Sequence, residues 1–306
     1  MFTKSNKQIA RDMTIKYTDV DISKLEFTNL EDNERSKGQK IAYPRYNFQN
    51  GDDLNIQCPW FHLVSYGIPK VSEYYPEDSK RLFIKVPLDE SNSEVKTFCN
   101  FLKVIDEKLS STEFKEKMFG GKASKYEYQS ILRLPQEDDD DNDTDSKGKK
   151  KDYGPKFPYM KLKIHASYPD NRILTTVFKS ILNNNKRERT KIDNINSLDD
   201  FASHVNYLSR IHPIIRPVKL WAQNPNKKDP MYGLTFKVFK LEVEPYVNMA
   251  TKFKDYLNVD GFLDSDSDSE LDKNDTDNNH KLDTSNSNVI KSESDLSESG
   301  SEEEEA

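Results

Sequence analysis

Aromatic rings and cations recur together on segments of this chain in which apolar and polar residues alternate. Bases of a single-stranded polynucleotide stack on exposed rings, while Lys and Arg side chains bind its phosphates. Three such segments run over 122–134, 158–166 and 211–245. The stacking candidates are Tyr126, Tyr128, Trp221, Tyr232 and Phe236. The phosphate-binding candidates are Lys125, Arg133, Lys161, Lys163, Arg216, Lys219 and Lys237.

Each of these rings has an alternative role in a hydrophobic core, because aromatic side chains contribute the largest buried areas. Strand alternation places successive side chains on opposite faces, so only some of the candidates can point toward a ligand. For Tyr126 and Tyr128 the two interpretations, a stacking platform or burial against a helix, are evenly balanced.

Reactive groups are not concentrated anywhere in the sequence. It lacks the phosphate-binding loop, dinucleotide, nucleophile-elbow and zinc-protease motifs. Its histidines are scattered without ligand spacing, at His62, His165, His204, His212 and His280. We therefore expect no enzyme, no metal site and no cofactor, although a nuclease built from acidic residues that converge in space stays open.

The clearest β-structure lies at 211–245, which predicts a hairpin with strands at 213–222 and 231–244. In the second strand Leu234, Phe236 and Val238 alternate with polar residues, and then the alternation shifts by one position. This shift predicts a bulge, a bend or burial of both faces near Val238.

The clearest helix follows a capping box at Ser91 and Glu94, and Gly120 supplies its stop. Its apolar stripe is typical of a face packed on a sheet, and consists of Val95, Phe98, Leu102, Ile105 and Leu109. A second helix is predicted over 197–210, with Ser197 as its cap. Further short strands are predicted over 40–48, 54–67, 81–86 and 172–178.

Charge is distributed unevenly along the chain. The net charge is −7, but residues 255–306 hold 17 acidic and 3 basic residues, so the rest of the chain is net +7. Removing the seven acidic residues of 137–145 raises that remainder to +14. A basic body of this kind attracts polyanions, and an acidic tail competes for the same surface.

These shifts in composition predict three parts. Residues 1–39 form an N-terminal arm, and 40–254 form a nucleic-acid-binding domain with a disordered acidic and basic loop at 136–154. Residues 255–306 form a disordered acidic tail. No apolar run approaches the roughly 20 residues of a membrane span, and Cys58 and Cys99 suggest no disulfide framework, so we expect an intracellular protein without a membrane partner.

Part of the hairpin also resembles a known family. The stretches Ile215-Arg216-Pro217, Leu220-Trp221, Tyr232 to Lys237 and Glu244-Pro245 look like the last two strands of single-stranded-DNA-binding proteins of nucleocytoplasmic large DNA viruses. Those proteins are allied to the OB-fold replication proteins of short-tailed phages. The resemblance is looser over 126–164, and little is similar before Lys122.

The resemblance implies an α+β, mainly β fold, with an OB-type antiparallel barrel, a helical insertion and a long disordered acidic tail. It also implies sequence-independent binding of single-stranded DNA in viral replication, recombination or repair, with a tail that regulates binding and recruits polymerase or helicase. The expected location is the cytoplasmic virus factory or the nucleus of the host cell, or the virion. Whether the protein forms a homo-oligomer stays open. The alternative is an acidic interaction protein without DNA binding, such as a chaperone of basic proteins or a virion core component.

Overall fold

A long hairpin organises the structure, a computed structural model that describes residues 13–47, 53–135, 156–183 and 186–246. Its strands β14 (Arg210–Ala222) and β15 (Met231–Glu244) pair antiparallel from Arg210 opposite Glu244 to Ala222 opposite Tyr232. The predicted hairpin is therefore confirmed. The loop 136–154, the tail 255–306 and the first twelve residues of the predicted arm lie outside the described residues.

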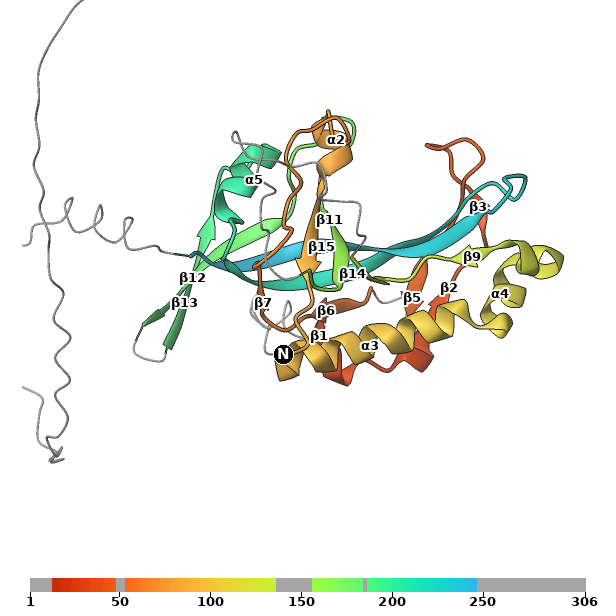
Figure 1. Cartoon of the computed structure of the whole chain (residues 1–306), viewed down its shortest axis with the longest axis horizontal. Helices are drawn as coiled ribbons and strands as arrows, with labels where there is room; N and C mark the ends of the chain where they lie inside the picture. Colours follow the sequence, from red (N-terminus) through yellow and green to blue (C-terminus); the bar gives the residue numbers. More distant parts are fainter. Residues whose placement is uncertain (1–12, 48–52, 136–155, 184–185, 247–306) are drawn as a thin grey trace, which may run out of the picture. The chain divides into compact units, whose positions relative to one another are not determined.

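Two irregularities curve this hairpin. Lys240 lies opposite Ile214, but Val238 lies opposite Ile215, so Phe239 is an extra residue in β15. This is the predicted change of phase near Val238, and it takes the form of a bulge. A second shift, in β14, leaves Val218 unpaired with β15. Bulges bend a strand and increase its twist, in agreement with the curved course of both strands (Figure 1).

Within the described part of the chain, the hairpin belongs to one 13-stranded sheet. Its other strands are β1 (Thr14–Lys16), β3 (Glu31–Asp32), β4 (Lys40–Ala42), β6 (Asn55–Gln57), β7 (Phe61–His62), β8 (Phe83–Pro87), β9 (Glu127–Tyr128), β10 (Leu132–Arg133), β11 (Tyr159–Ile164), β12 (Thr176–Asn183) and β13 (Lys186–Ile192). A separate antiparallel pair is formed by β2 (Leu25–Phe27) and β5 (Pro44–Tyr46).

The sheet is mixed and open. Strands β9, β11 and β12 run parallel to β15, whereas β14 runs antiparallel to it. After β11 the chain passes through the β12–β13 hairpin and β14 before it returns as β15, which gives β11 and β15 the same direction. The α+β, mainly β class is thus confirmed, but the described strands do not close into the antiparallel OB-type barrel that was expected.

Helix α3 (Ser93–Ser110) has the predicted apolar stripe but starts from a different cap. The Asn92 side chain accepts hydrogen bonds from the backbone N–H groups of Glu94 and Val95, at 2.9 and 3.3 Å. Ser91 instead donates its backbone N–H to Asp89, so the prediction of a Ser91 capping box is wrong. All five residues of the stripe are buried.

The remaining helices are short. Helix α3 ends at Ser110, and Ser111 caps α4 (Thr112–Phe119), which is followed by the 3-10 helix η3 (Gly120–Lys125). Helix α5 (Leu198–His204) has the predicted Ser197 cap but ends six residues before 210. The others are η1 (Tyr17–Asp19), η2 (Ile22–Lys24) and α2 (Asp78–Arg81). Among the described residues, no helix combines the length and the apolar character that crossing a bilayer requires.

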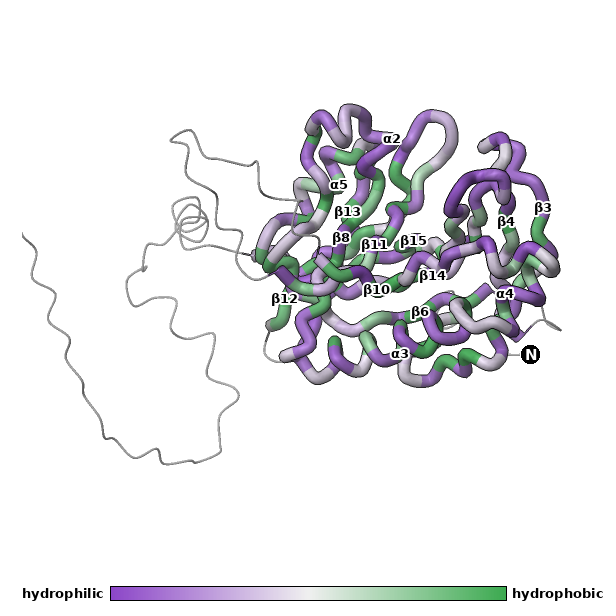
Figure 2. The backbone as a smooth tube through the Cα atoms, turned by 45° about the vertical axis from the view of Figure 1, so that its right-hand side comes forward, coloured by the Kyte–Doolittle hydropathy of each residue, from purple (hydrophilic) through white to green (hydrophobic). Residues whose placement is uncertain are grey.

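The two faces of the central strands have different surroundings. Helix α3 covers one face, while α2, α5 and β3 stand on the other side of the sheet (Figures 1 and 2). Ile84, Leu162, Phe236 and Val238 are buried in the core. Their strand neighbours must point to the opposite face, because successive side chains of a strand alternate.

Candidate nucleic-acid interface

That opposite face contains two adjoining hollows of about 630 and 330 Å³. Lys163, Lys219 and Thr235 line both of them, so the two form one continuous depression. We call it the trough, and its central residues are Arg133, Lys161, Lys163, Lys219, Trp221, Thr235 and Lys237. Six of the twelve residues predicted to bind nucleic acid therefore lie together.

Strand register explains this convergence. Lys163 in β11 lies directly opposite Lys237 in β15, and Lys219 in β14 lies opposite Thr235. Side chains of directly opposed residues share a face of the sheet. Lys161 is two residues from Lys163 and shares that face as well. The two strands of the hairpin and β11, which is distant from them in sequence, thus contribute lysines to one floor.

The lysines of the trough are close to one another and lack acidic partners. No hydrogen bond or ion pair joins Lys163, Lys219 or Lys237 to a carboxylate in the described part of the chain. Burial lowers the pKa of Lys219 and of Lys237, and the charge of Lys163 lowers both further. Positive charge therefore gathers on the floor of the trough, which suits a polyanion.

Lys161 is the most perturbed of these cations. Its pKa falls to about 8, first because it is buried and then because Arg133 and Lys163 lie nearby. Its ammonium nitrogen lies 3.6 Å from the centre of the Phe83 ring, a cation–π contact that holds the side chain in place. In the free protein, Lys161 is therefore half deprotonated at about pH 8 and still mostly charged at pH 7.

This pKa predicts a pH-dependent affinity. A bound phosphate favours the charged ammonium and raises the pKa of Lys161, so binding takes up a proton and affinity falls as pH rises through 8. Between pH 7 and 9 we expect a loss of up to about tenfold from this group. The measurement is the dissociation constant of oligo(dT) at both pH values. In the matched Lys161→Arg variant the cation stays charged, so this part of the pH dependence should disappear; equal dependence in both proteins would contradict the prediction.

Trp221 is the one predicted stacking ring that lines the trough. It is half-buried and lies across from Gly233. A Cβ atom at Gly233 would approach Trp221 Cζ2 to 3.0 Å and the Gln129 carbonyl oxygen to 3.2 Å. The missing side chain at position 233 therefore lets the indole lie close against the neighbouring strand.

Three other predicted stacking rings belong to the core. Tyr126, Tyr232 and Phe236 have only 5%, 0% and 1% of their surface exposed. Tyr126 stacks on Phe119 with 4.0 Å between ring centres, and the Tyr232 hydroxyl donates to the Leu109 carbonyl at 2.5 Å. These rings point toward the α3 and α4 side of the sheet, so the prediction that they stack on bases is wrong.

Tyr128 is held by a hydrogen bond to a carboxylate and is not exposed for stacking. Its hydroxyl donates to Asp106 at 2.7 Å, and burial, followed by the Asp106 charge, raises the pKa of Tyr128. The same carboxylate of α3 accepts hydrogen bonds from the Ser130 hydroxyl and from the backbone N–H groups of Ile131 and Leu132. The Tyr128 ring thus anchors β9 and β10 to α3, and its predicted stacking role is wrong as well.

Two predicted cations lie apart from the trough. Lys125 is exposed at the end of η3 and lines neither hollow. Arg216 lies opposite Lys237, but its guanidinium bonds to Asp53 and Asn55 and lies 4.5 Å from the Phe239 ring centre. Arg216 therefore extends the cationic face with its charge already paired.

Several trough residues were missed in the sequence. Gln39 and Gln129 line the smaller hollow, and the larger one is bordered by the acidic side chains of Glu31, Asp32 and Glu34. Lys85, directly across from Lys161 in β8, lies close enough to lower the pKa of Lys161. The position of Lys85 in the predicted strand 81–86 was the available signal, whereas the acidic border depends on how the 31–39 segment folds back.

Reactive groups remain sparse in the described part of the chain, where no three His, Cys, Asp or Glu residues are grouped to hold a metal ion. Both cysteines are buried, and burial raises the pKa of each thiol, that of Cys99 to about 11. A thiol with a raised pKa is a poor nucleophile at neutral pH.

The fold and this face define a class: an α+β protein whose open, mixed sheet has a helix-covered face and a cationic one. No known protein-family model matches the chain. The chain is similar to an uncharacterized protein of Acanthamoeba polyphaga mimivirus, with 24% identity over 273 residues. The match covers 82% of this chain and 65% of that relative. This weak similarity to a protein of a large DNA virus assigns the chain no activity.

Proposed function

We propose that this protein binds single-stranded DNA in the trough, without sequence preference, during viral DNA replication, recombination or repair. The observation that supports it most is the grouping of Lys163, Lys219 and Lys237, none paired with a described carboxylate, in the same trough that Trp221 lines. Lysines recognise the phosphates that every nucleotide shares, and an indole accepts any base by stacking.

Single-stranded rather than duplex DNA is favoured by the same geometry. Stacking on Trp221 requires a base whose face is free, and in a duplex both faces are covered by neighbouring bases. A closed OB-type barrel is not needed for this chemistry, because an open curved sheet presents the same combination of rings and cations. Regulation of binding by the acidic tail and recruitment of polymerase or helicase remain parts of the proposal that rest on composition and resemblance.

A salt titration of the affinity for oligo(dT) and for a duplex of equal length tests this function. We expect tighter binding of the single strand and a linear fall of log affinity with log salt, with a slope of about −0.7 for each phosphate contact. Absence of binding at low salt, or equal affinity for the duplex, would count against the proposal.

Trp221 provides a direct optical measurement. Oligo(dT) should quench its fluorescence, and Trp221→Ala should cost about 1–3 kcal/mol of binding free energy, the usual contribution of one base stacked on a ring. The second tryptophan, Trp60, stacks on His212 and lies away from the trough. In the control variant Trp60→Phe the quenching should remain; quenching that depends on Trp60 instead would contradict the assignment.

A further inference from the structure

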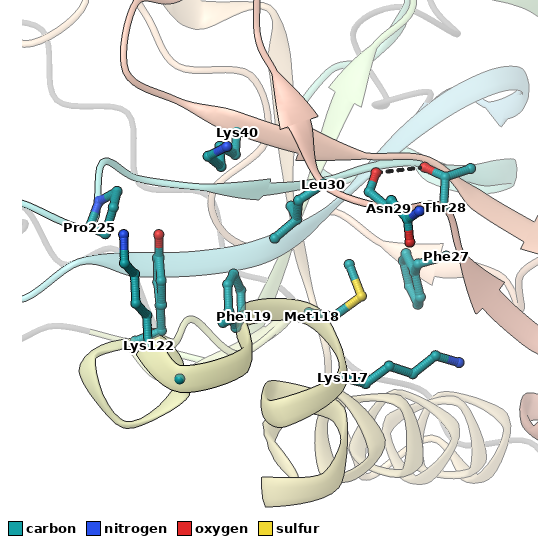
Figure 3. A pocket seen from close by; sticks show the side chains of 12 residues that line it. Phe27, Thr28, Asn29, Leu30, Lys40, Lys117, Met118, Phe119, Lys122 and Pro225 are labelled. Atoms are coloured by element: carbon teal, nitrogen blue, oxygen red, sulfur yellow. Dashed lines mark hydrogen bonds between the residues drawn. The ribbon is translucent and has the colours of Figure 1, made fainter.

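A third hollow, of about 690 Å³, lies between α4 and the segment 27–30 (Figure 3). Its apolar part is formed by Leu30, Met118 and Phe119, together with Phe27. Lysines surround this apolar part, with Lys117 and Lys122 toward its two ends and Lys40 on the opposite wall (Figure 3). We call this hollow the α4 groove.

The α4 groove is separate from the trough. Lys40 of β4 lines the groove, whereas the next residue of the same strand, Ile41, lines the larger hollow of the trough. Adjacent residues of a strand point to opposite faces, so β4 separates the floors of the two sites, and their rims meet at the ion pair of Lys40 with Asp32. A ligand of the α4 groove therefore need not be the polynucleotide.

Charge restricts the class of ligand. Among the residues that the structure describes, no acidic side chain lines the α4 groove. Lys117 and Lys122 are exposed, and neither forms an ion pair or hydrogen bond with another described residue. Lys40 is the exception, since its ammonium lies 3.3 Å from Asp32. Two free ammonium groups at the ends of the apolar part of the α4 groove would attract carboxylates.

The rings of the groove indicate that its apolar part does not receive a base. One face of Phe119 is covered by Tyr126, at 4.0 Å between ring centres, and Phe119 also meets Tyr232 edge to face at 4.9 Å. Phe27 is engaged edge to face by Phe114. Both rings are thus engaged within the protein, whereas the aliphatic side chains of Leu30 and Met118 line the groove and suit an inserted apolar side chain.

We propose that the α4 groove binds an acidic peptide segment of a partner protein. One bulky apolar side chain of the peptide inserts between Leu30 and Met118, and its flanking carboxylates pair with Lys117 and Lys122. A single anchoring side chain with charged flanks gives specificity from the anchor and a rapid, salt-sensitive association from the charges. The protein would then hold a polynucleotide and a protein partner on separate surfaces.

The test uses the full chain and a fluorescein-labelled 12-residue peptide of Asp and Glu with one central Phe. We expect saturable, salt-sensitive binding by fluorescence anisotropy, and loss of binding when the peptide carries Ser in place of Phe. Lys117→Glu combined with Lys122→Glu should weaken binding by at least about tenfold, and Met118→Asp should have a similar effect. The control Lys96→Glu, an exposed lysine of α3 outside the groove, should leave it unchanged.

The same variants separate this site from the trough, because none of them should change the affinity for oligo(dT). The proposal is overturned if the peptide fails to bind, or if its affinity is unchanged both by the charge-reversal variants and by the replacement of Phe in the peptide. It is also overturned if oligo(dT) displaces the peptide, which would make the groove part of the nucleic-acid path. A peptide of residues 260–272 that binds there at least tenfold more tightly would assign the groove to the chain's own acidic segment instead.

Discussion

The double variant Lys163→Glu, Lys219→Glu should lose at least about 100-fold in affinity for single-stranded oligonucleotides. Each substitution removes a charge-assisted contact to phosphate, worth about 1.5–3 kcal/mol, and places a like charge beside the ligand. A tenfold change corresponds to about 1.4 kcal/mol, so two contacts account for the expected loss. The salt slope should also decrease by about 1.4, because two phosphate contacts disappear.

The fold should tolerate this change. The charge of Lys163 lowers the pKa of Lys161, Lys219 and Lys237, which shows that these ammonium groups repel one another. Replacing two of the cations relieves this repulsion, so the melting temperature should stay the same or rise. Lys96→Glu, which changes the net charge half as much, is the control for a nonspecific effect of charge. An affinity that remains unchanged in the double variant at low salt would remove the trough from the proposed function.

Asp106→Ala should be the most destabilising single substitution considered for this protein. The carboxylate accepts four hydrogen bonds, from the Tyr128 and Ser130 hydroxyls and from two backbone N–H groups. Its removal leaves several partly buried donors without a partner, at about 1–3 kcal/mol for each donor that water cannot reach. We expect a loss of about 3 kcal/mol or more in the free energy of unfolding, measured by urea denaturation.

The neighbouring substitution Glu107→Ala is the control, since Glu107 is exposed on the same helix and should change stability by less than about 0.5 kcal/mol. The Asp106 contacts also position β10, the strand of Arg133. Asp106→Ala should therefore weaken binding of oligo(dT) even where the protein remains folded. A similar stability for the two variants would show that Asp106 does not hold β9 and β10 on α3.

Strand patterns allowed part of the trough to be predicted. In 158–166 every second residue is apolar, and this placed Lys161 and Lys163 on one open face with no knowledge of neighbouring strands. The hairpin pattern placed Lys219 and Lys237 in the same way. In each case the long, regular alternation left one side of the strand for the core and the other for a ligand.

The tyrosines could not be assigned by that reasoning. Alternation over 122–134 places both tyrosines on one face but does not indicate which face is buried, and the structure keeps only short strands there, with β9 limited to Glu127 and Tyr128. Burial of Tyr126 and Tyr232 depends on α3 and α4 packing against the same strands, which is a tertiary effect. Tyr128 faces Asp106 across 22 positions of sequence, and no local pattern indicates that contact.

In the segment 172–192, the sequence failed to predict a strand that the structure contains. The sequence predicted a short strand over 172–178 and no strand after it, but the structure contains a hairpin of β12 and β13. Strand β13 has almost no apolar side chains, so propensity gave no sign of it. Its arginines instead reach carboxylates of β15, with Arg187 at 3.2 Å from Glu244 and Arg189 at 2.8 Å from Glu242.

The bulge at Phe239 and the alternation along β15 make the interior and the cationic face two sides of the same strand. Lys237 lies between Phe236 and Val238, which are both buried in the core. The spacing of the ammonium groups is consequently set by the volumes of side chains that never meet the ligand. Conservative exchanges such as Val to Ile at these buried positions would change how well the lysines align with the phosphates. Evolution could therefore adjust the binding affinity while every residue that contacts the ligand is preserved.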